Sequence, residues 1–226
     1  MSRSLVQALA GACLALSFSA QAAVSSFQSL SAFQTATTSN VNARLVDFES
    51  PASSLGAAAF TVSGSVGAGT ALRVTTNPFW TTSGTHFLGD TDAGNLDQLV
   101  GGDSVTFSFA TAVHAFGLYV VTVSDTQPGD LTLRAGAHSI SNGPQSQAIT
   151  DGQGTYAYFL GLSASTPAEG FSSITLSTSN AGLYVFSVDD VRHSSLSAVP
   201  EPEGWALASV GLALGGLVVA RRRRQG

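Results

Sequence analysis

Three acidic residues, Glu49, Asp189 and Asp190, have the types and positions that could hold a cation. If residues 184–191 form a β-strand, strict alternation places Asp190 on the same side as the apolar residues of that strand. An ionised carboxylate beside an apolar row is costly unless it is paired or coordinated. Glu49 and Asp189 could add oxygens, and backbone carbonyls could complete the roughly six to eight ligands that Ca²⁺ prefers. These residues predict a structural calcium site; the alternative is that the two aspartates are solvated or pair with Arg192.

The remaining candidates for chemistry do not form a catalytic set. Trp80 could stack on a sugar ring, with a buried anchor as the alternative. The acidic run 90–97 fails as an EF-hand because its glycine falls at loop position five and Gly101 stands where Glu is needed. Residues 102–105 (GDSV) are similar to an esterase nucleophile block, but no Asp-x-x-His follows, and the four histidines are scattered. We therefore predict that the protein is not an enzyme.

The charge balance restricts the class of partner. The chain has 226 residues, with 9 Lys+Arg against 14 Asp+Glu and a net charge of −5. No basic face remains once the two ends are set aside, which excludes a nucleic-acid-binding protein. Residues 23–198 keep four arginines and twelve acidic residues, a net charge of −8. That acidity argues against anionic polymers as partners and leaves room for cations.

The first 22 residues have the plan of a secretory signal peptide. Arg3 provides the positive start, and residues 5–18 form an apolar stretch of 14 residues. That stretch is too short for a membrane span, which needs roughly 20 residues. Ala20 and Ala22 supply the small-x-small pattern that signal peptidase accepts, so we expect cleavage before Ala23. The single cysteine lies inside this segment, so the mature chain has no disulfide.

The C-terminal segment 199–226 is typical of a membrane anchor. An uncharged run of 16 residues, 205–220, reaches about 24 Å as a helix, enough to cross a bilayer with local thinning. A terminal arginine cluster would stay on the cytoplasmic side and leave the body outside the inner membrane. A Pro-Glu-Pro tripeptide precedes the run and consists of Pro200, Glu201 and Pro202. The arginine cluster follows the run and consists of Arg221, Arg222, Arg223 and Arg224.

These three parts, in this order, resemble the PEP-CTERM sorting signal, also catalogued as the ice-binding-protein C-terminal domain. No regular Thr-x-Thr array that would suit ice binding recurs along the chain. The resemblance implies recognition by an exosortase, a membrane-embedded cysteine transpeptidase of Gram-negative bacteria. The tail would be cut near the Pro-Glu-Pro tripeptide, and the body released or transferred to the cell surface, in a setting of exopolysaccharide production and biofilm. The alternative is a plain C-terminal anchor that is never cleaved.

Between the two ends, residues 23–193 are predicted to form an all-β domain. Residues 30–37 have helical spacing, whereas later segments such as 104–110 alternate apolar and polar residues as strands do. Residues 114–123 are apolar on both faces, which predicts a central strand covered on each side. About ten short strands with polar turns indicate a two-sheet antiparallel, jelly-roll-like β-sandwich with a short N-terminal helix. Residues 194–198 are predicted to link this domain to the tail.

Two segments of the body resemble carbohydrate-binding-module jelly rolls: residues 45–49 (LVDFE) near its start and residues 188–191 (VDDV) near its end. The resemblance implies that the first and last strands lie close together and hold a structural calcium between them. We therefore expect an exported, non-enzymatic surface protein with a structural or adhesive role in an exopolysaccharide matrix. The alternative function is a carbohydrate-binding module that binds the exopolysaccharide.

Overall fold

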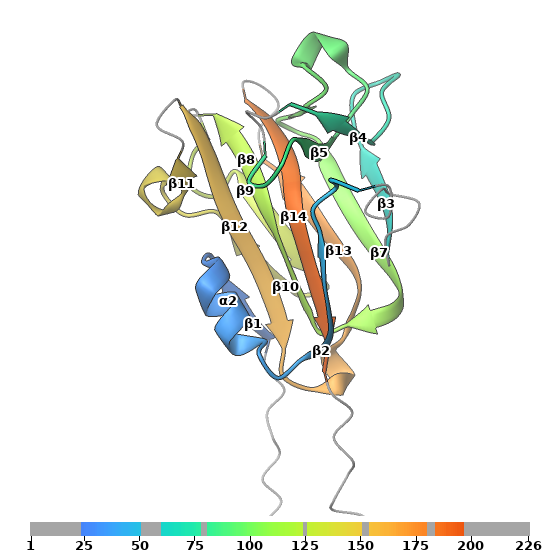
Figure 1. Ribbon diagram of the computed structural model, residues 1–226, viewed down its shortest axis with the longest axis vertical. Helices are drawn as coiled ribbons and strands as arrows, with labels where there is room; N and C mark the ends of the chain where they lie inside the picture. Colours follow the sequence, from blue (N-terminus) through green and yellow to red (C-terminus); the bar gives the residue numbers. More distant parts are fainter. Residues whose placement is uncertain are drawn as a thin grey trace, which may run out of the picture. The chain divides into compact units, whose positions relative to one another are not determined.

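The computed structural model describes residues 24–50, 60–77, 81–123, 126–150, 154–179 and 184–196. All of them belong to the unit Met1–Leu196. They form two antiparallel sheets and one short α-helix, α2 (Leu30–Ala36) (Figure 1). The predicted signal peptide 1–22 and the predicted tail 199–226, with its membrane helix 205–220, lie outside these residues. Within the described part of the chain, no helix combines the length and the apolar character that crossing a membrane requires.

The larger sheet has nine strands in the described residues, and its main path runs β1-β12-β8-β14-β5-β4. β11 pairs with β12 at one side, and β2 and β6 pair with β14. The first and last long segments of the domain, β2 and β14, are therefore hydrogen-bonded neighbours. The strands are β1 (Val24–Phe27), β2 (Val41–Val46), β4 (Arg73–Thr76), β5 (His86–Gly89), β6 (Leu99–Val100), β8 (Ala115–Val123), β11 (Ile149–Thr150), β12 (Thr155–Ala164) and β14 (Val185–Ser195).

The smaller sheet has five strands in the order β10-β9-β13-β7-β3. Its strands are β3 (Phe60–Ser65), β7 (Ser104–Val113), β9 (Leu131–Ala135), β10 (His138–Ser141) and β13 (Phe171–Thr178). Short 3₁₀ turns at Ala93–Asn95, Gln145–Gln147 and Pro167–Glu169 complete the described secondary structure. Two antiparallel sheets with one short helix near the N-terminus confirm the predicted β-sandwich.

The main hydrophobic core lies between the two sheets, and β7 illustrates why the sequence builds it. Val105, Phe107 and Phe109 alternate with partly exposed polar residues and all three are buried. Leu118 of β8 and Phe186 of β14 belong to the same core from the opposite sheet. Each large apolar side chain that is fully buried stabilises the fold by about 1.5–3 kcal/mol. The predicted strand 104–110 is therefore confirmed, and it extends to Val113.

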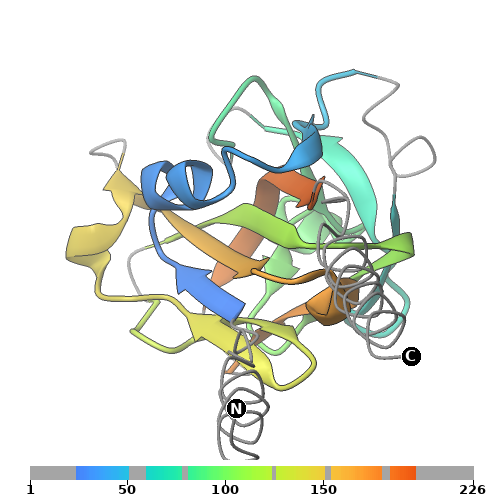
Figure 2. The same ribbon diagram turned by 90° about the horizontal axis from the view of Figure 1, so that it is seen from below.

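The central strand β8 is buried on both faces, as its sequence predicts. One face joins the main core, and the other packs in a second cluster with Phe33 of α2 and Phe159 of β12. Figure 2 shows α2 on one side of β8 and β12, with β9 and β10 on the other. Gly117 and Gly161 lie opposite each other on these strands, and a Cβ at either position would crowd the Phe159 ring. The missing side chains make room for the aromatic cluster beneath α2.

The last strand extends beyond the predicted domain boundary. β14 ends at Ser195, two residues into the predicted linker 194–198. Ser194 is buried and pairs with Ala115 of β8, and its Oγ accepts a hydrogen bond of 2.9 Å from the Asn40 side chain. The His114 N–H donates to the Ser194 carbonyl at 2.8 Å. These contacts hold Ser194 and Ser195 in the sheet, so the predicted boundary at residue 193 is corrected to Ser195.

Candidate functional site

A bulge in β14 decides which side its acidic residues face. The register with β8 shifts between Asp189 and Arg192, and Asp190 has a φ of +50°. Val188 and Val191 both join the core between the sheets, which strict alternation would forbid because they are three residues apart. The prediction that Asp190 shares the side of the apolar residues is therefore wrong. Asp190 lines a groove on the opposite, outer face of the larger sheet.

Asp189 is fully buried and anchors the loop that precedes β5. Its Oδ2 accepts hydrogen bonds from the backbone N–H groups of Thr82 and Ser83, at 2.7 and 3.1 Å, and from the Thr82 hydroxyl at 2.9 Å. Its Oδ1 accepts from the Asp190 N–H at 2.7 Å. Burial is the main cause that raises the pKa of Asp189 to about 6, against the lowering effect of the Thr82 N–H. The carboxylate binds the loop at the cost of its own desolvation.

Glu49 anchors the other end of the same loop. Its carboxylate accepts from the backbone N–H groups of Thr85 and His86, and it lies 3.0 Å from His86 Nδ1. Burial alone would raise the pKa of Glu49, but the hydrogen bonds from His86 and Thr85 together hold that pKa below its ordinary value. Gly84 has a φ of +56°, and a Cβ there would collide with the Glu49 carboxyl group. The close approach therefore needs glycine at this turn.

The three predicted calcium ligands thus act on one loop, but as acceptors of protein hydrogen bonds. Asp190 also takes part, because its Oδ1 accepts from the Ser83 hydroxyl at 2.9 Å and its Oδ2 lies 3.7 Å from an Arg192 nitrogen. In the part of the chain that the structure describes, no three His, Cys, Asp or Glu side chains gather to hold a metal ion. Donor groups occupy the positions where a cation would bind, so this arrangement does not fit calcium. Of the two aspartates, only Asp190 faces Arg192, and both are buried rather than solvated.

Chelation provides the direct measurement. We expect the full-length protein to have the same melting temperature in excess EDTA and in excess calcium, because protein donors already satisfy the three carboxylates. Differential scanning fluorimetry at neutral pH measures this. A melting temperature that falls on chelation in the wild type, and not in Asp190→Ala, would restore the calcium site.

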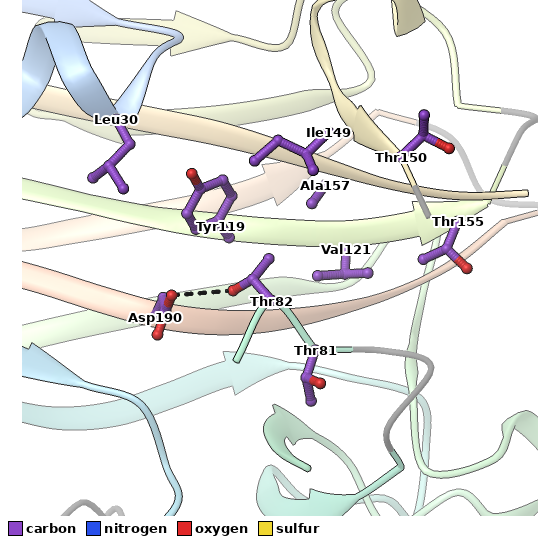
Figure 3. Close-up of a pocket in the computed structure, with 10 residues that line it drawn as sticks. All are labelled: Leu30, Thr81, Thr82, Tyr119, Val121, Ile149, Thr150, Thr155, Ala157 and Asp190. Carbon is purple, nitrogen blue, oxygen red and sulfur yellow. Dashed lines mark hydrogen bonds between the residues drawn. The ribbon is translucent and has the colours of Figure 1, made fainter. Parts of the chain in front are cut away.

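The loop and the bulge together form one wall of a groove on the outer face, with a volume of about 340 Å³. We call it the outer groove. Its floor consists of side chains from β8 and β12, and its other wall comes from α2 and β11 (Figure 3). The ten lining residues are Leu30, Thr81, Thr82, Tyr119, Val121, Ile149, Thr150, Thr155, Ala157 and Asp190. A second cavity of about 320 Å³ shares the lining residues Leu30, Tyr119, Ile149 and Ala157 with the outer groove.

The outer groove combines an apolar floor with a rim of hydroxyl groups. Tyr119, Val121 and Ala157 form the floor, and Ile149 stands at the rim with 59% of its surface exposed. Burial raises the pKa of the Tyr119 hydroxyl, which therefore stays protonated at neutral pH and can donate a hydrogen bond. Asp190 is the single charged residue among the ten, and its oxygens already accept from neighbouring hydroxyls. The groove suits an uncharged ligand that has both apolar and hydroxyl surface.

Most of the sequence-predicted site residues are not described by the structure. Trp80, the cleavage residues Ala20, Ala22 and Ala23, and the whole sorting signal lie outside the described residues. The sequence analysis did not identify the loop 81–85 (TTSGT), although the composition contained a signal for it. Residues 23–198 have twelve acidic residues and only four arginines, so many carboxylates need other hydrogen-bond donors, and this run is rich in hydroxyl and backbone N–H groups. Comparisons of this chain with protein-family models, curated proteins and solved structures gave no match.

Proposed function

We propose that this chain is an exported, non-enzymatic β-sandwich protein that adheres to exopolysaccharide at the cell surface. Signal peptidase removes residues 1–22, the tail holds a precursor in the inner membrane facing the periplasm, and an exosortase then cuts near Pro200-Glu201-Pro202. The two ends of the sequence support export and sorting. The observation that supports the adhesive role is the outer groove, which is neutral apart from Asp190 and has an apolar floor beneath a hydroxyl rim.

A polysaccharide matches that groove in chemistry. Sugar rings present apolar C–H faces and hydroxyl edges, and aromatic side chains such as Tyr119 pack against the faces while threonine hydroxyls bond the edges. Thr81 and Thr82 line one wall and Thr150 and Thr155 the far end. Trp80, which lies outside the described residues, directly precedes Thr81 in the sequence and stays a candidate stacking residue. This geometry favours polysaccharide binding over a purely structural role.

The finer fold assignment supports the same proposal. From β7 to β14 the chain passes repeatedly between the two sheets, with β8, β12 and β14 in one and β7, β9 and β13 in the other. This alternation, with β2 beside β14, is the arrangement expected of a jelly roll. In this chain α2 covers part of the outer face of β8 and β12, and the outer groove lies on the same face beside Leu30 of that helix.

Polysaccharide retention by the purified full-length chain tests the adhesive role. Ile149→Asp places a charge at the groove rim and is expected to weaken binding about tenfold, because the apolar contact is replaced by a carboxylate that must be desolvated. Leu96→Asp is the matched control, since Leu96 is 62% exposed and lies outside the groove. Equal retention of the two variants, or no retention of the wild type on matrix polysaccharide, would contradict the proposal.

Intact mass measurement tests the sorting step. Protein recovered from the surface of the producing cells is expected to lack Arg221, Arg222, Arg223 and Arg224, because cleavage near the Pro-Glu-Pro tripeptide removes everything that follows. Changing Glu201 to Ala should leave the uncut precursor in the membrane fraction. A surface form that still contains the four arginines would leave the plain anchor as the better explanation.

A further inference from the structure

The floor of the outer groove contains a polar group that the protein itself does not use. Tyr119 is only 6% exposed, and it lines both the outer groove and the second cavity. Figure 3 shows its hydroxyl oxygen directed away from Asp190, with no hydrogen bond to any other residue that lines the groove. No other described residue forms a hydrogen bond with this hydroxyl either. A nearly buried hydroxyl without a partner carries a desolvation cost that a ligand can recover by bonding to it.

Apolar side chains surround that hydroxyl on the same face of the larger sheet. Ile149 pairs with Ala157, and Ala157 pairs with Val121, so these three residues form one row across β11, β12 and β8. Tyr119 lies two residues before Val121 on the regular strand β8 and therefore faces the same side. Leu30 of α2 packs against the cluster that contains Tyr119, Val121 and Ala157. The hydroxyl is thus a single polar group within an apolar surface.

This surface selects a particular kind of ligand group. The ligand must bring an acceptor to the protonated Tyr119 hydroxyl and place apolar atoms directly beside that acceptor. A sugar hydroxyl can accept the bond, but it also lays its own polar hydrogen against the apolar floor, where it loses water without compensation. An acetyl group carries a carbonyl oxygen and a methyl group on one carbon atom, and its carbonyl oxygen is an acceptor only. An acetyl group therefore satisfies both requirements at once.

We propose that the outer groove recognises an acetylated sugar residue of the exopolysaccharide. The acetyl carbonyl accepts a hydrogen bond from the Tyr119 hydroxyl, and the acetyl methyl packs against the row of Ile149 and Ala157. The inference rests on the proposed binding of polysaccharide and adds the identity of the sugar. The groove volume of about 340 Å³ is near the lower end of the about 300–1,000 Å³ usual for ligand sites, which suits one substituted sugar of a longer chain.

The polar surroundings agree with a neutral acetylated sugar. The second cavity, which shares its apolar residues with the outer groove, adds three exposed amide side chains, Gln28, Gln34 and Gln147. Side-chain amides both donate and accept, so they are complementary to the N–H and C=O of an acetamido group. An acidic sugar would instead bring a second negative charge into a groove whose one charged residue is Asp190. The ligand that fits is therefore acetylated and uncharged.

The test compares two tetrasaccharides with the same β-1,4-linked backbone. Chitotetraose carries an acetamido group on each sugar, whereas cellotetraose carries a hydroxyl at the same position. The purified full-length chain, in non-ionic detergent, is titrated with each by isothermal titration calorimetry. Chitotetraose is expected to bind at least about tenfold more tightly, the ratio that one hydrogen bond and one buried methyl group supply together.

A matched pair of tyrosine variants assigns that preference to the groove. Tyr119→Phe keeps the ring and removes only the hydroxyl, so the preference for chitotetraose is expected to fall about fivefold, the worth of one neutral hydrogen bond. Tyr156→Phe is the control. Tyr156 lies on the neighbouring strand β12 but packs against the main core on the inner face, and it lines neither cavity. The control variant should keep the wild-type preference.

The outcomes separate this inference from the proposed function. Equal binding of the two tetrasaccharides by a wild type that is still retained on matrix polysaccharide overturns the acetylated sugar and leaves the adhesive role intact. A Tyr119→Phe variant with the full wild-type preference overturns the role given to this hydroxyl. A wild type that binds neither tetrasaccharide nor matrix polysaccharide contradicts the inference and the proposed function together.

Discussion

Raising the pH from about 4 to about 7 is expected to lower the free energy of unfolding by about 2 kcal/mol through Asp189 alone. Burial, opposed by the Thr82 N–H and reinforced by the charge of Asp190, raises the pKa of Asp189 from 3.8 to about 6 in the folded protein. The unfolded carboxyl group keeps the lower value. Between these two values the folded state binds more protons, so its stability falls as the pH rises. Denaturant unfolding at a series of pH values measures this slope.

The slope can be assigned to Asp189 with two variants. The side chain in Asp189→Asn does not titrate. The fall in the free energy of unfolding between pH 4 and pH 7 that we attribute to Asp189 should therefore be absent from this variant, whatever its overall stability. Glu49→Gln tests a pH dependence of the opposite sign. The pKa of Glu49 is lowered in the folded state, so the contribution of Glu49 to the free energy of unfolding is lost as the pH falls. Asp90 and Asp103 have pKa values that burial raises, and both remain in every variant. Identical pH slopes in the wild type and Asp189→Asn would contradict the assignment.

The regular part of the fold could be predicted because its strands repeat a simple pattern. Val105, Phe107 and Phe109 alternate with polar residues, and the buried face of β7 follows from that period. In β8 both faces are apolar, which indicates cover on both sides, and α2 provides the second cover. These predictions depend on local sequence alone, because the pattern of apolar residues within one strand shows whether one face or both faces of that strand are buried.

The position of Asp190 could not be predicted in the same way. A bulge adds one residue to a strand without any change in composition, and every side chain after it moves to the opposite face. The positive φ of Asp190 is rare for a residue other than glycine, and nothing in the run 188–191 announces it. The acidic residues were correctly identified as a group that needs partners, but the partners are Thr82 and Ser83, more than a hundred residues away.

The outer face was missed for a related reason. The outer groove draws its residues from α2, from loop 81–85 and from several strands, and no single segment contains it. The pairing of β2 with β14, which places Arg44 opposite His193, is likewise a long-range contact. What the sequence does record is the imbalance between acidic residues and arginines, which makes the place of each arginine informative.

Removing the ring of Phe33 is expected to cause the largest loss on this face. Phe33 is 4% exposed, and its ring lies 5.7 Å from that of Phe27 and 5.3 Å from that of Phe159. Phe33→Ala is expected to cost about 3–5 kcal/mol. Because α2 has only seven residues, it has no stability of its own in water and depends on this contact. Loss of about 3 kcal/mol from the docking of α2 would speed its amide hydrogen exchange about a hundredfold, at about 1.4 kcal/mol per factor of ten.

The same change should abolish the proposed polysaccharide binding. Leu30 of α2 forms a wall of the outer groove, so release of α2 opens that site. Thr35→Ala is the control, because Thr35 is exposed on the same helix and its loss should change stability by no more than about 0.5 kcal/mol. If Phe33→Ala keeps polysaccharide binding while α2 exchanges freely, the binding site does not need the helix and has been placed on the wrong surface.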